Sequence, residues 1–263
     1  MTSPRRICFT AAWTVLLINP CARSASTCQA GSLQIGTVSN NPFTADVVGG
    51  AWAISLAADK KQTGLIPTLH IARDSQGRVV VKIPTGWAPG RSHYEEADFY
   101  WTTICDPVAK TTTDIRQEGV YDNHSEAATG NGTSLVLHIT GKVKVAKVDT
   151  LSSASQPSDF HEFSKPEARK VEDIREQTVL GVQAHGYRWW VPVDGAMIES
   201  DYTELFQSEE LASDLSQVTT RGDGPRGRGE VREELKNLQR VEPDPRLFQI
   251  PTGYKIELAS NVK

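Results

Sequence analysis

At 263 residues, the chain is long enough for one large all-β domain or two small domains with a sizeable apolar core. Its hydrophobic content of 38% and charged content of 23% exclude a membrane bundle and a largely disordered chain. A net charge of −4 disfavours nucleic acid as a partner, because nucleic-acid binding needs a basic surface against the phosphates.

Residues 1–25 are predicted to be a secretory signal peptide. Arg5 and Arg6 precede an apolar run from Ile7 to Ile18, and small residues follow at positions 24–26. The run is shorter than the roughly 20 residues that a membrane-spanning helix needs. We therefore expect export to the periplasm or the extracellular space, without an integral membrane segment. Cleavage would remove three arginines and no acidic residue, which lowers the net charge to −7.

The rest of the chain is predicted to form a short lead and one domain. Residues 26–41 are polar and rich in Gly, Asn and Ser, which predicts a flexible N-terminal lead. Residues 42–263 show strand patterning along most of their length, so we expect a single antiparallel β-sheet domain. A stretch rich in Ser and Pro, at about 149–168, is predicted to be a long connection within that domain.

The clearest local signal is a hairpin over residues 69–83. Leu69 and Ile71 alternate with polar or small residues. Val79, Val81 and Ile83 then recur at every second position, with Val80 and Lys82 between them. The segment Asp74–Gly77 has turn chemistry, since Asp and Ser hydrogen-bond nearby backbone and Gly tolerates a positive φ. This pattern predicts two antiparallel strands joined by a four-residue loop.

Other segments are predicted from the same patterns. The segment Tyr202–Leu211 has helical character. A tip rich in Gly and Arg between two strand-like pieces contains the tripeptide Arg221–Asp223, an RGD match that is common by chance. Further strands are predicted around residues 52–56, 98–106, 134–147 and 187–193.

The ending "VEPDPRLFQIPTGYKI", residues 241–256, is predicted to be a structural closure. Pro243 and Pro245 hold the residues before them extended. Leu247 and Phe248 can then cover the end of the sheet, and the residues from Tyr254 to Leu258 can add a last strand.

Two cysteines, Cys28 and Cys105, remain after the signal segment. An oxidising compartment permits a disulfide bond between them, and two unpaired thiols are the alternative, because sequence does not show their separation. A lipid-anchored cysteine is disfavoured, since Pro20 precedes Cys21 and Thr27 precedes Cys28 where lipoprotein processing prefers a small residue.

The sequence offers no catalytic constellation. It lacks a nucleophile elbow, a phosphate-binding loop and a dinucleotide fingerprint. His93 with Glu95 and Glu96, or His161 with Glu162, could bind a metal, but a metal site needs three or four converging ligands, so we expect these to be solvated loop residues. We expect no catalytic residue, no metal and no cofactor.

Tryptophans give the only candidate binding surface. Trp52, Trp101, Trp189 and Trp190 are large apolar groups suited either to the core or to an apolar groove. Trp189 and Trp190 are neighbours on a predicted strand and should point to opposite faces. One of them therefore needs cover from a helix, a loop, a partner or a ligand.

Several stretches resemble a known group of proteins. "HIARDSQGR", "ICDPVAK", "LGVQAHGYR", "VPVDGAM" and "NLQRVEPDPRLFQIPTGYKI" occur in the order seen in an uncharacterised exported family of acidobacterial genomes. The ending also resembles that of LolA-like lipoprotein carriers. The resemblance implies a mainly β (α+β) fold, a curved antiparallel sheet or half-barrel with one or two covering helices around an apolar cavity.

These observations lead to three hypotheses for function. The first is a non-enzymatic envelope protein that binds a hydrophobic small molecule or lipid-like group in a half-barrel groove. The second is an envelope scaffold that meets a protein partner through an exposed aromatic face. The third, a hydrolase, is the least favoured because no nucleophile, base or metal constellation is present.

Overall fold

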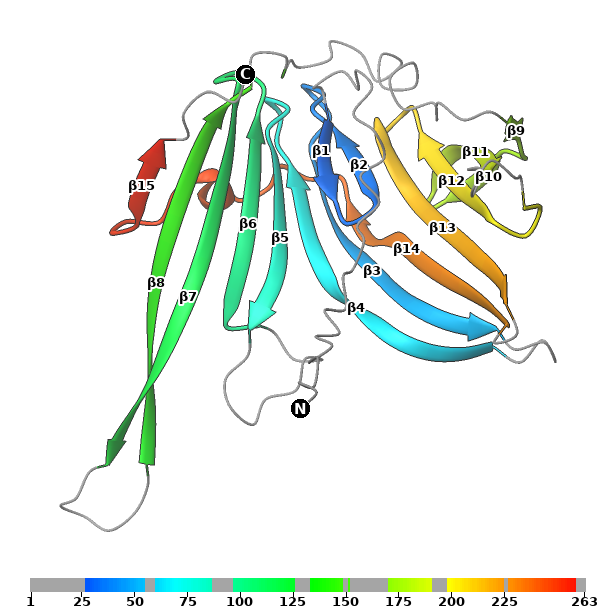
Figure 1. The fold of residues 1–263 in the computed structure, drawn as a ribbon. Coiled ribbons are helices and arrows are strands. Elements are labelled where there is room, and N and C mark those ends of the chain that lie inside the picture. The colour runs from blue at the N-terminus through cyan, green and yellow to red at the C-terminus, as the bar shows by residue number, and fades with distance from the viewer. Residues whose placement is uncertain are drawn as a thin grey trace, which may run out of the picture.

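The computed structural model describes residues 27–54, 60–86, 97–125, 133–148, 151, 170–190, 198–224 and 227–258. Within them, fifteen strands form one open sheet that is bent into an arch (Figure 1). The prediction of a mainly β sheet, mostly antiparallel and not closed, is confirmed. The prediction of one or two covering helices is wrong for the described residues, whose helical element is the 3-10 turn η1 (Pro245–Phe248). No helix in these ranges is long and apolar enough to cross a bilayer.

The strands come from nearly the whole described chain. They are β1 (Thr27–Ala30), β2 (Leu33–Gly36), β3 (Phe43–Ile54), β4 (Lys60–Arg73), β5 (Val79–Gly86), β6 (Phe99–Asp106), β7 (Thr111–Ser125), β8 (Thr133–Lys147), β9 (Lys170–Asp173), β10 (Gln177–Val179), β11 (Val182–Trp190), β12 (Tyr202–Ser208), β13 (Ser213–Gly224), β14 (Gly227–Gln239) and β15 (Lys255–Leu258). The signal-peptide prediction lies outside the described residues, and so does most of the predicted Ser/Pro-rich connection.

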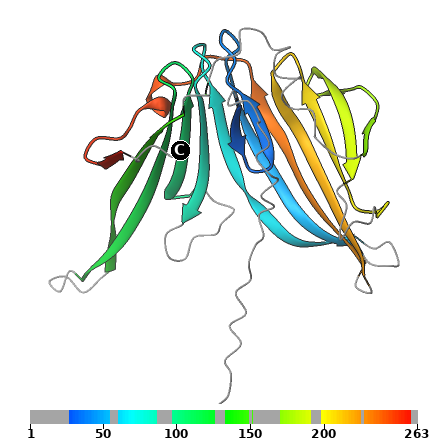
Figure 2. The same cartoon turned by 45° about the horizontal axis from the view of Figure 1, so that its top comes forward.

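Two antiparallel meanders build the sheet. Strands β3 to β8 follow one another in the first, and β11 to β14 in the second. The meanders join in the middle of the sheet, where β14 pairs antiparallel with β3. At one margin β9 and β10 pair with β11, and at the other β15 pairs parallel with β8. In Figure 1 and Figure 2, β6 to β8 lie in one arm of the arch, whereas β3 and β4 run beside β13 and β14 in the other.

A hairpin of β1 and β2 covers one face of the sheet, and this differs from the flexible lead predicted for residues 26–41. Cys28, Ala30, Leu33 and Ile35 are at most 1% exposed. They pack in the largest apolar core, because alternate residues of these short strands point into the sheet. We call the covered face the hairpin face; it carries Val47, Ile71, Val81 and Leu235.

The chain's ending covers the opposite face, which we call the C-terminal face. Phe248 of η1 is 8% exposed and packs in a second core with Ala72, Val80 and Ile104. Tyr254 packs at the edge of the same core, and β15 follows it as a last strand. The predicted final strand is present as β15, but Leu247 and Phe248 cover a face of the sheet and not its end.

The predicted hairpin over residues 69–83 is present, with a longer loop than expected. Arg73 pairs with Val79, so the loop runs over five residues, 74–78, instead of four. Gly77 has a φ of 81°, the left-handed conformation that the turn needs and that glycine adopts without strain.

The predicted helix over Tyr202–Leu211 is wrong. Residues 202–208 form β12, in which Thr203, Leu205 and Gln207 are buried at alternate positions. A turn at 209–212 then ends the strand. The acidic residues of this segment resemble a helix surface in sequence, but pairing with both β11 and β13 overrides that local preference. The 134–147 segment is one long strand, β8.

Candidate functional site

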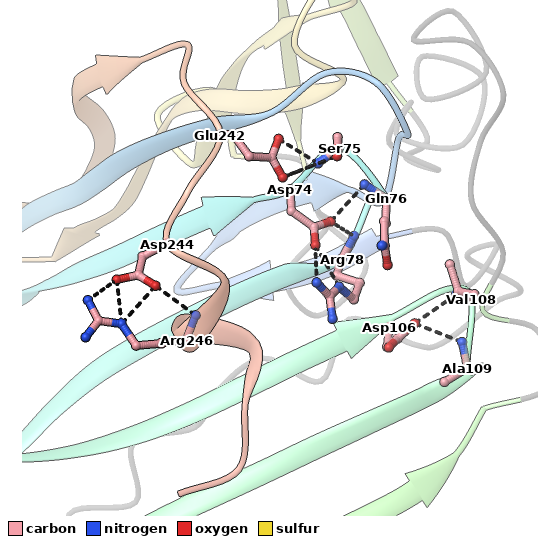
Figure 3. Close-up of polar contacts among 10 residues, drawn as sticks. All are labelled: Asp74, Ser75, Gln76, Arg78, Asp106, Val108, Ala109, Glu242, Asp244 and Arg246. Atoms are coloured by element: carbon pink, nitrogen blue, oxygen red, sulfur yellow. Dashed lines mark hydrogen bonds and ion pairs between the residues drawn. The ribbon is translucent and has the colours of Figure 1, made fainter.

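The sequence motifs meet at one corner of the sheet, where they act as structural ties (Figure 3). The Asp74 carboxylate accepts hydrogen bonds from the backbone N–H groups of Gln76 and Arg78, and from Arg78 Nε at 2.7 Å. Asp106 accepts from the N–H groups of Val108 and Ala109 in the β6–β7 turn. These bonds satisfy backbone donors within turns, as Asp commonly does.

The chain's ending is bound to the same corner. Glu242 accepts hydrogen bonds from the backbone N–H and the hydroxyl of Ser75. The Arg78 guanidinium lies 4.8 Å from the ring centroid of Phe248. Asp244 accepts from the backbone N–H of Arg246 and so caps η1. The two most distinctive motifs thus hold each other in place, and none of these groups faces a cavity described in the structure.

The candidate tryptophans do not gather into one groove. Trp101 in β6 and Trp189 in β11 share the hairpin face, but six strands lie between them in the sheet. Trp190 lies on the C-terminal face. Trp52 is in β3, and its side chain is outside the described part of the structure.

Trp189 and Trp190 have cover from the chain itself, whereas Trp101 is half-buried, with the Arg116 guanidinium 4.4 Å from its ring centroid. Trp189 is 9% exposed and packs with Tyr187 and Leu205. Trp190 is 7% exposed, and its Nε1 donates to the carbonyl of Glu199. Both rings are thus held by the fold, which leaves little of either for a ligand or partner.

The structure joins Cys28 and Cys105 by a disulfide bond, one of the two alternatives that the sequence left open. The bond links β1 to β6 across 77 positions of the chain. Arg221 and Gly222 of the RGD match lie in β13, where the Gly222 N–H donates to Asp201. No cluster of three or more potential metal ligands occurs in the described ranges.

A cleft of about 590 Å³ opens on the C-terminal face of β11–β14. One wall is formed by Ile174 and Arg175, which lie between β9 and β10, together with Gln177 and Val179 of β10. The floor is a grid of paired residues, in which Arg188, Glu204, Val218 and Arg232 form one row across the strands. Phe206, Ser216 and Glu234 form the next row. The cleft is lined by Ile174, Arg175, Gln177, Val179, Arg188, Glu204, Phe206, Ser216, Val218, Arg232 and Glu234.

The apolar part of this cleft depends on Gly186 in β11. A Cβ atom on Gly186 would lie 2.6 Å from Ile174 Cγ1 and 2.6 Å from Phe206 Cε1. The missing side chain therefore lets the turn at Ile174 approach Phe206. Together with Val218, these residues form the apolar patch of the cleft.

Arg188 and Glu204 form the central ion pair of the cleft. Arg188 Nε and Nη2 both donate to Glu204 Oε1, the first at 2.9 Å. The hydrogen bond to Glu204 raises the pKa of Arg188 above its ordinary value. The guanidinium also lies 4.9 Å from the ring centroid of Tyr202. This pair has opposite charges in contact and so presents little net charge to a ligand.

Two other unusual ionisable groups lie away from the cleft. Burial, followed by the charges of Asp173 and Glu209, raises the pKa of Tyr187 to about 12, so its phenol is neutral at pH 7. Burial lowers the pKa of Arg73 to about 9, and the group still carries its charge at pH 7. Arg73 donates to the carbonyls of Asn41 and Gly36, which fixes the end of the β1–β2 hairpin to β4.

The cleft residues were not among the candidates from sequence. Arg188 follows the aromatic and glycine pattern of β11, and Glu204 and Phe206 lie in the segment mistaken for a helix. Their association depends on the register of β11, β12, β13 and β14, which a single sequence does not specify. Alternation of Glu204 and Phe206 with buried residues was the one usable signal.

No family model matches the chain, and no curated protein matches it. The chain is similar to the crystal structure of a DUF1329 family protein from Desulfovibrio piger, at 8% identity over 81% of this chain and 91% of that chain, with a TM-score of 0.20. It is also similar to a LolA superfamily protein from Nitrosomonas europaea, at 6% identity over 80% and 90%, with a TM-score of 0.18. These similarities are distant, and they support no conclusion about function.

Proposed function

We propose that the protein is a non-enzymatic, exported binding protein that holds a small amphipathic molecule in the cleft of β11–β14. The observation that carries this proposal is the composition of the cleft. An apolar patch at Phe206, Val218 and Ile174 lies directly beside charged side chains. Ligand sites commonly combine an apolar lining with a few polar groups that fix orientation.

The ligand is hydrophobic or lipid-like, as expected from the sequence, but its site is the cleft of β11–β14 and not a half-barrel groove. The β1–β2 hairpin packs on the hairpin face and fills the core there. The cleft on the opposite face is open to a ligand. Its volume of about 590 Å³ lies within the roughly 300–1,000 Å³ typical of small-molecule sites.

Export is supported by two independent features of the chain. The first 25 residues have the order of basic, apolar and small residues that is typical of a signal peptide. The disulfide bond between Cys28 and Cys105 is of a kind that persists in oxidising compartments. The periplasm or the extracellular space is therefore the proposed location.

Neighbouring residues of β13 provide the test. Ser216 lines the cleft, whereas Gln217 lies on the opposite face, and both are half-buried. Ser216→Phe should fill the cleft, and Gln217→Phe is its matched control. Protein purified without detergent would be analysed by native mass spectrometry and by organic extraction.

We expect a co-purifying small molecule with the wild type and with Gln217→Phe, and its loss from Ser216→Phe. Direct titration with decanoate and decanol then measures the affinity of each variant. Equal binding by Ser216→Phe and the wild type would show that the cleft is not the site. Absence of binding to any variant, in extracts and in titrations, would refute the binding function.

A further inference from the structure

The two acidic side chains of the cleft are already neutralised by their own partners. Glu204 is paired with Arg188, as described above. Glu234 Oε1 lies 3.0 Å from Lys236 Nζ, and the Glu234 side chain is 33% exposed. Neither carboxylate therefore offers a free negative charge to a cationic ligand.

Two arginines of the cleft, in contrast, keep donors for a ligand. Arg232 has a contact of only 3.6 Å with Glu230, and its side chain is 44% exposed. Arg175 is exposed in the turn between β9 and β10, and no ion pair joins it to another described residue. Each guanidinium carries five N–H donors in a planar fork that matches a carboxylate or phosphate.

This excess of positive charge is local. The described residues 170–190, 198–224 and 227–239 contain thirteen acidic and seven basic residues, so this arm of the sheet is acidic as a whole. If the average charge of these strands set the ligand preference, the cleft would bind a cation. The lining of the cleft itself holds three arginines and two glutamates, and Arg175 and Arg232 carry the guanidinium donors that Glu204 does not use.

The size of the cleft limits the rest of the ligand. The cleft of about 590 Å³ lies within the roughly 300–1,000 Å³ typical of small-molecule sites. One acyl chain with a small head group belongs to that size class.

We propose that the ligand of the cleft is a single-chain amphiphile with an anionic head group, whose head is held at one of the two arginines, Arg175 or Arg232, and whose chain lies on Phe206, Val218 and Ile174. This inference rests on the proposed function of the cleft and names the chemical class of its ligand. A fatty carboxylate of moderate length is the simplest member of that class.

Three probes of equal chain length test the head-group preference. Decanoate, decanol and decylammonium would be titrated below their micelle concentrations and monitored by calorimetry. We expect the wild type to bind decanoate at least about tenfold more tightly than decanol, because a charge-assisted hydrogen bond typically gives a preference of this order. Decylammonium should bind more weakly than decanol, and added salt should weaken decanoate binding alone.

The double variant Arg175→Gln/Arg232→Gln should lose the preference for decanoate and keep its affinity for decanol. Arg221→Gln, an exposed change in β13 outside the cleft, is the matched control and should behave as the wild type. Circular dichroism checks that each variant folds, and the salt dependence of the wild type supplies a second measurement that needs no variant.

Each outcome separates this inference from the proposed function. If decanoate and decanol bind the wild type equally, or decylammonium binds most tightly, the anionic head group is wrong while the binding function stands. If the double variant keeps the preference, Arg175 and Arg232 are not the selecting groups. If no probe binds the wild type, both the proposed function and this inference fall.

Discussion

At the scale of single residues, one covalent bond and a few buried polar contacts add to the apolar packing that attaches the β1–β2 hairpin. The disulfide bond joins Cys28 to Cys105 in β6. Arg73 donates to the carbonyls of Gly36 and Asn41, and its guanidinium lies 4.7 Å from the ring centroid of Phe43. A hairpin of two four-residue strands is too small to be stable alone, so it depends on these ties and on its packing against the sheet.

Removing the disulfide bond should destabilise the protein without changing its fold. We expect the variant Cys28→Ala/Cys105→Ala to unfold with a free energy lower by about 2–5 kcal/mol, because the bond closes a long loop in the unfolded chain. Urea denaturation of oxidised protein measures the difference. A reductant should lower the free energy of unfolding of the wild type to that of the double variant. The value for the double variant should not change. A wild-type free energy of unfolding that does not change with reductant would contradict this prediction.

At the scale of elements, the closure by the C-terminal segment depends on a close approach to β8. Gly141 has no side chain, and a Cβ atom there would lie 2.0 Å from the Tyr254 ring. Tyr254 also accepts a hydrogen bond from Gln117 in β7. Tyr254 therefore positions the turn that leads into β15.

Gly141→Ala should displace Tyr254 and lower the free energy of unfolding by about 1–3 kcal/mol, as overpacking commonly does. Gly229→Ala is the matched control, because the nearest atom to its Cβ would be 3.7 Å away. Urea denaturation compares the two. The double variant Gly141→Ala/Tyr254→Ala should recover part of the loss relative to Tyr254→Ala alone. Equal effects at Gly141 and Gly229 would show that the contact with Tyr254 is unimportant.

Elements whose signals lie close together in the sequence were predictable. Elements that depend on pairing between distant segments of the chain were not. The hairpin over residues 69–83 was found because its turn residues and its alternating pattern lie within a few positions of each other. The β12 segment was mistaken for a helix because its acidic residues, such as Glu204, Glu209 and Glu210, suit a helix surface locally. The cleft was missed for a related reason: its arginines and its apolar patch come from separate strands whose register depends on the whole sheet.

At the scale of the whole molecule, one apolar core connects both arms of the arch. The largest core combines Val81 of β5, Val47 of β3 and Leu235 of β14 with the β1–β2 hairpin. The two meanders therefore share buried surface and are not independent units. The expectation of a single domain remains a prediction that this shared core supports.

We expect one cooperative unfolding transition for the whole chain. Tryptophan fluorescence and far-ultraviolet circular dichroism should give the same midpoint in urea. Leu235→Ala, at a position only 1% exposed, should shift both midpoints together and cost about 2–5 kcal/mol. Val231→Ala on the same strand is the control, since Val231 is 45% exposed. Separate transitions for the two probes would show that the arms unfold independently.

The pairing of β3 with β14 has a consequence for how the chain is made. Strand β4 follows β3 directly and can pair with it early, but the other edge of β3 has no partner until β14 has been synthesised, near the end of the chain. An unpaired strand edge readily pairs with other chains. During synthesis, β3 therefore exposes a long edge to its surroundings, and a chaperone that holds extended segments would find this strand unpaired on one side.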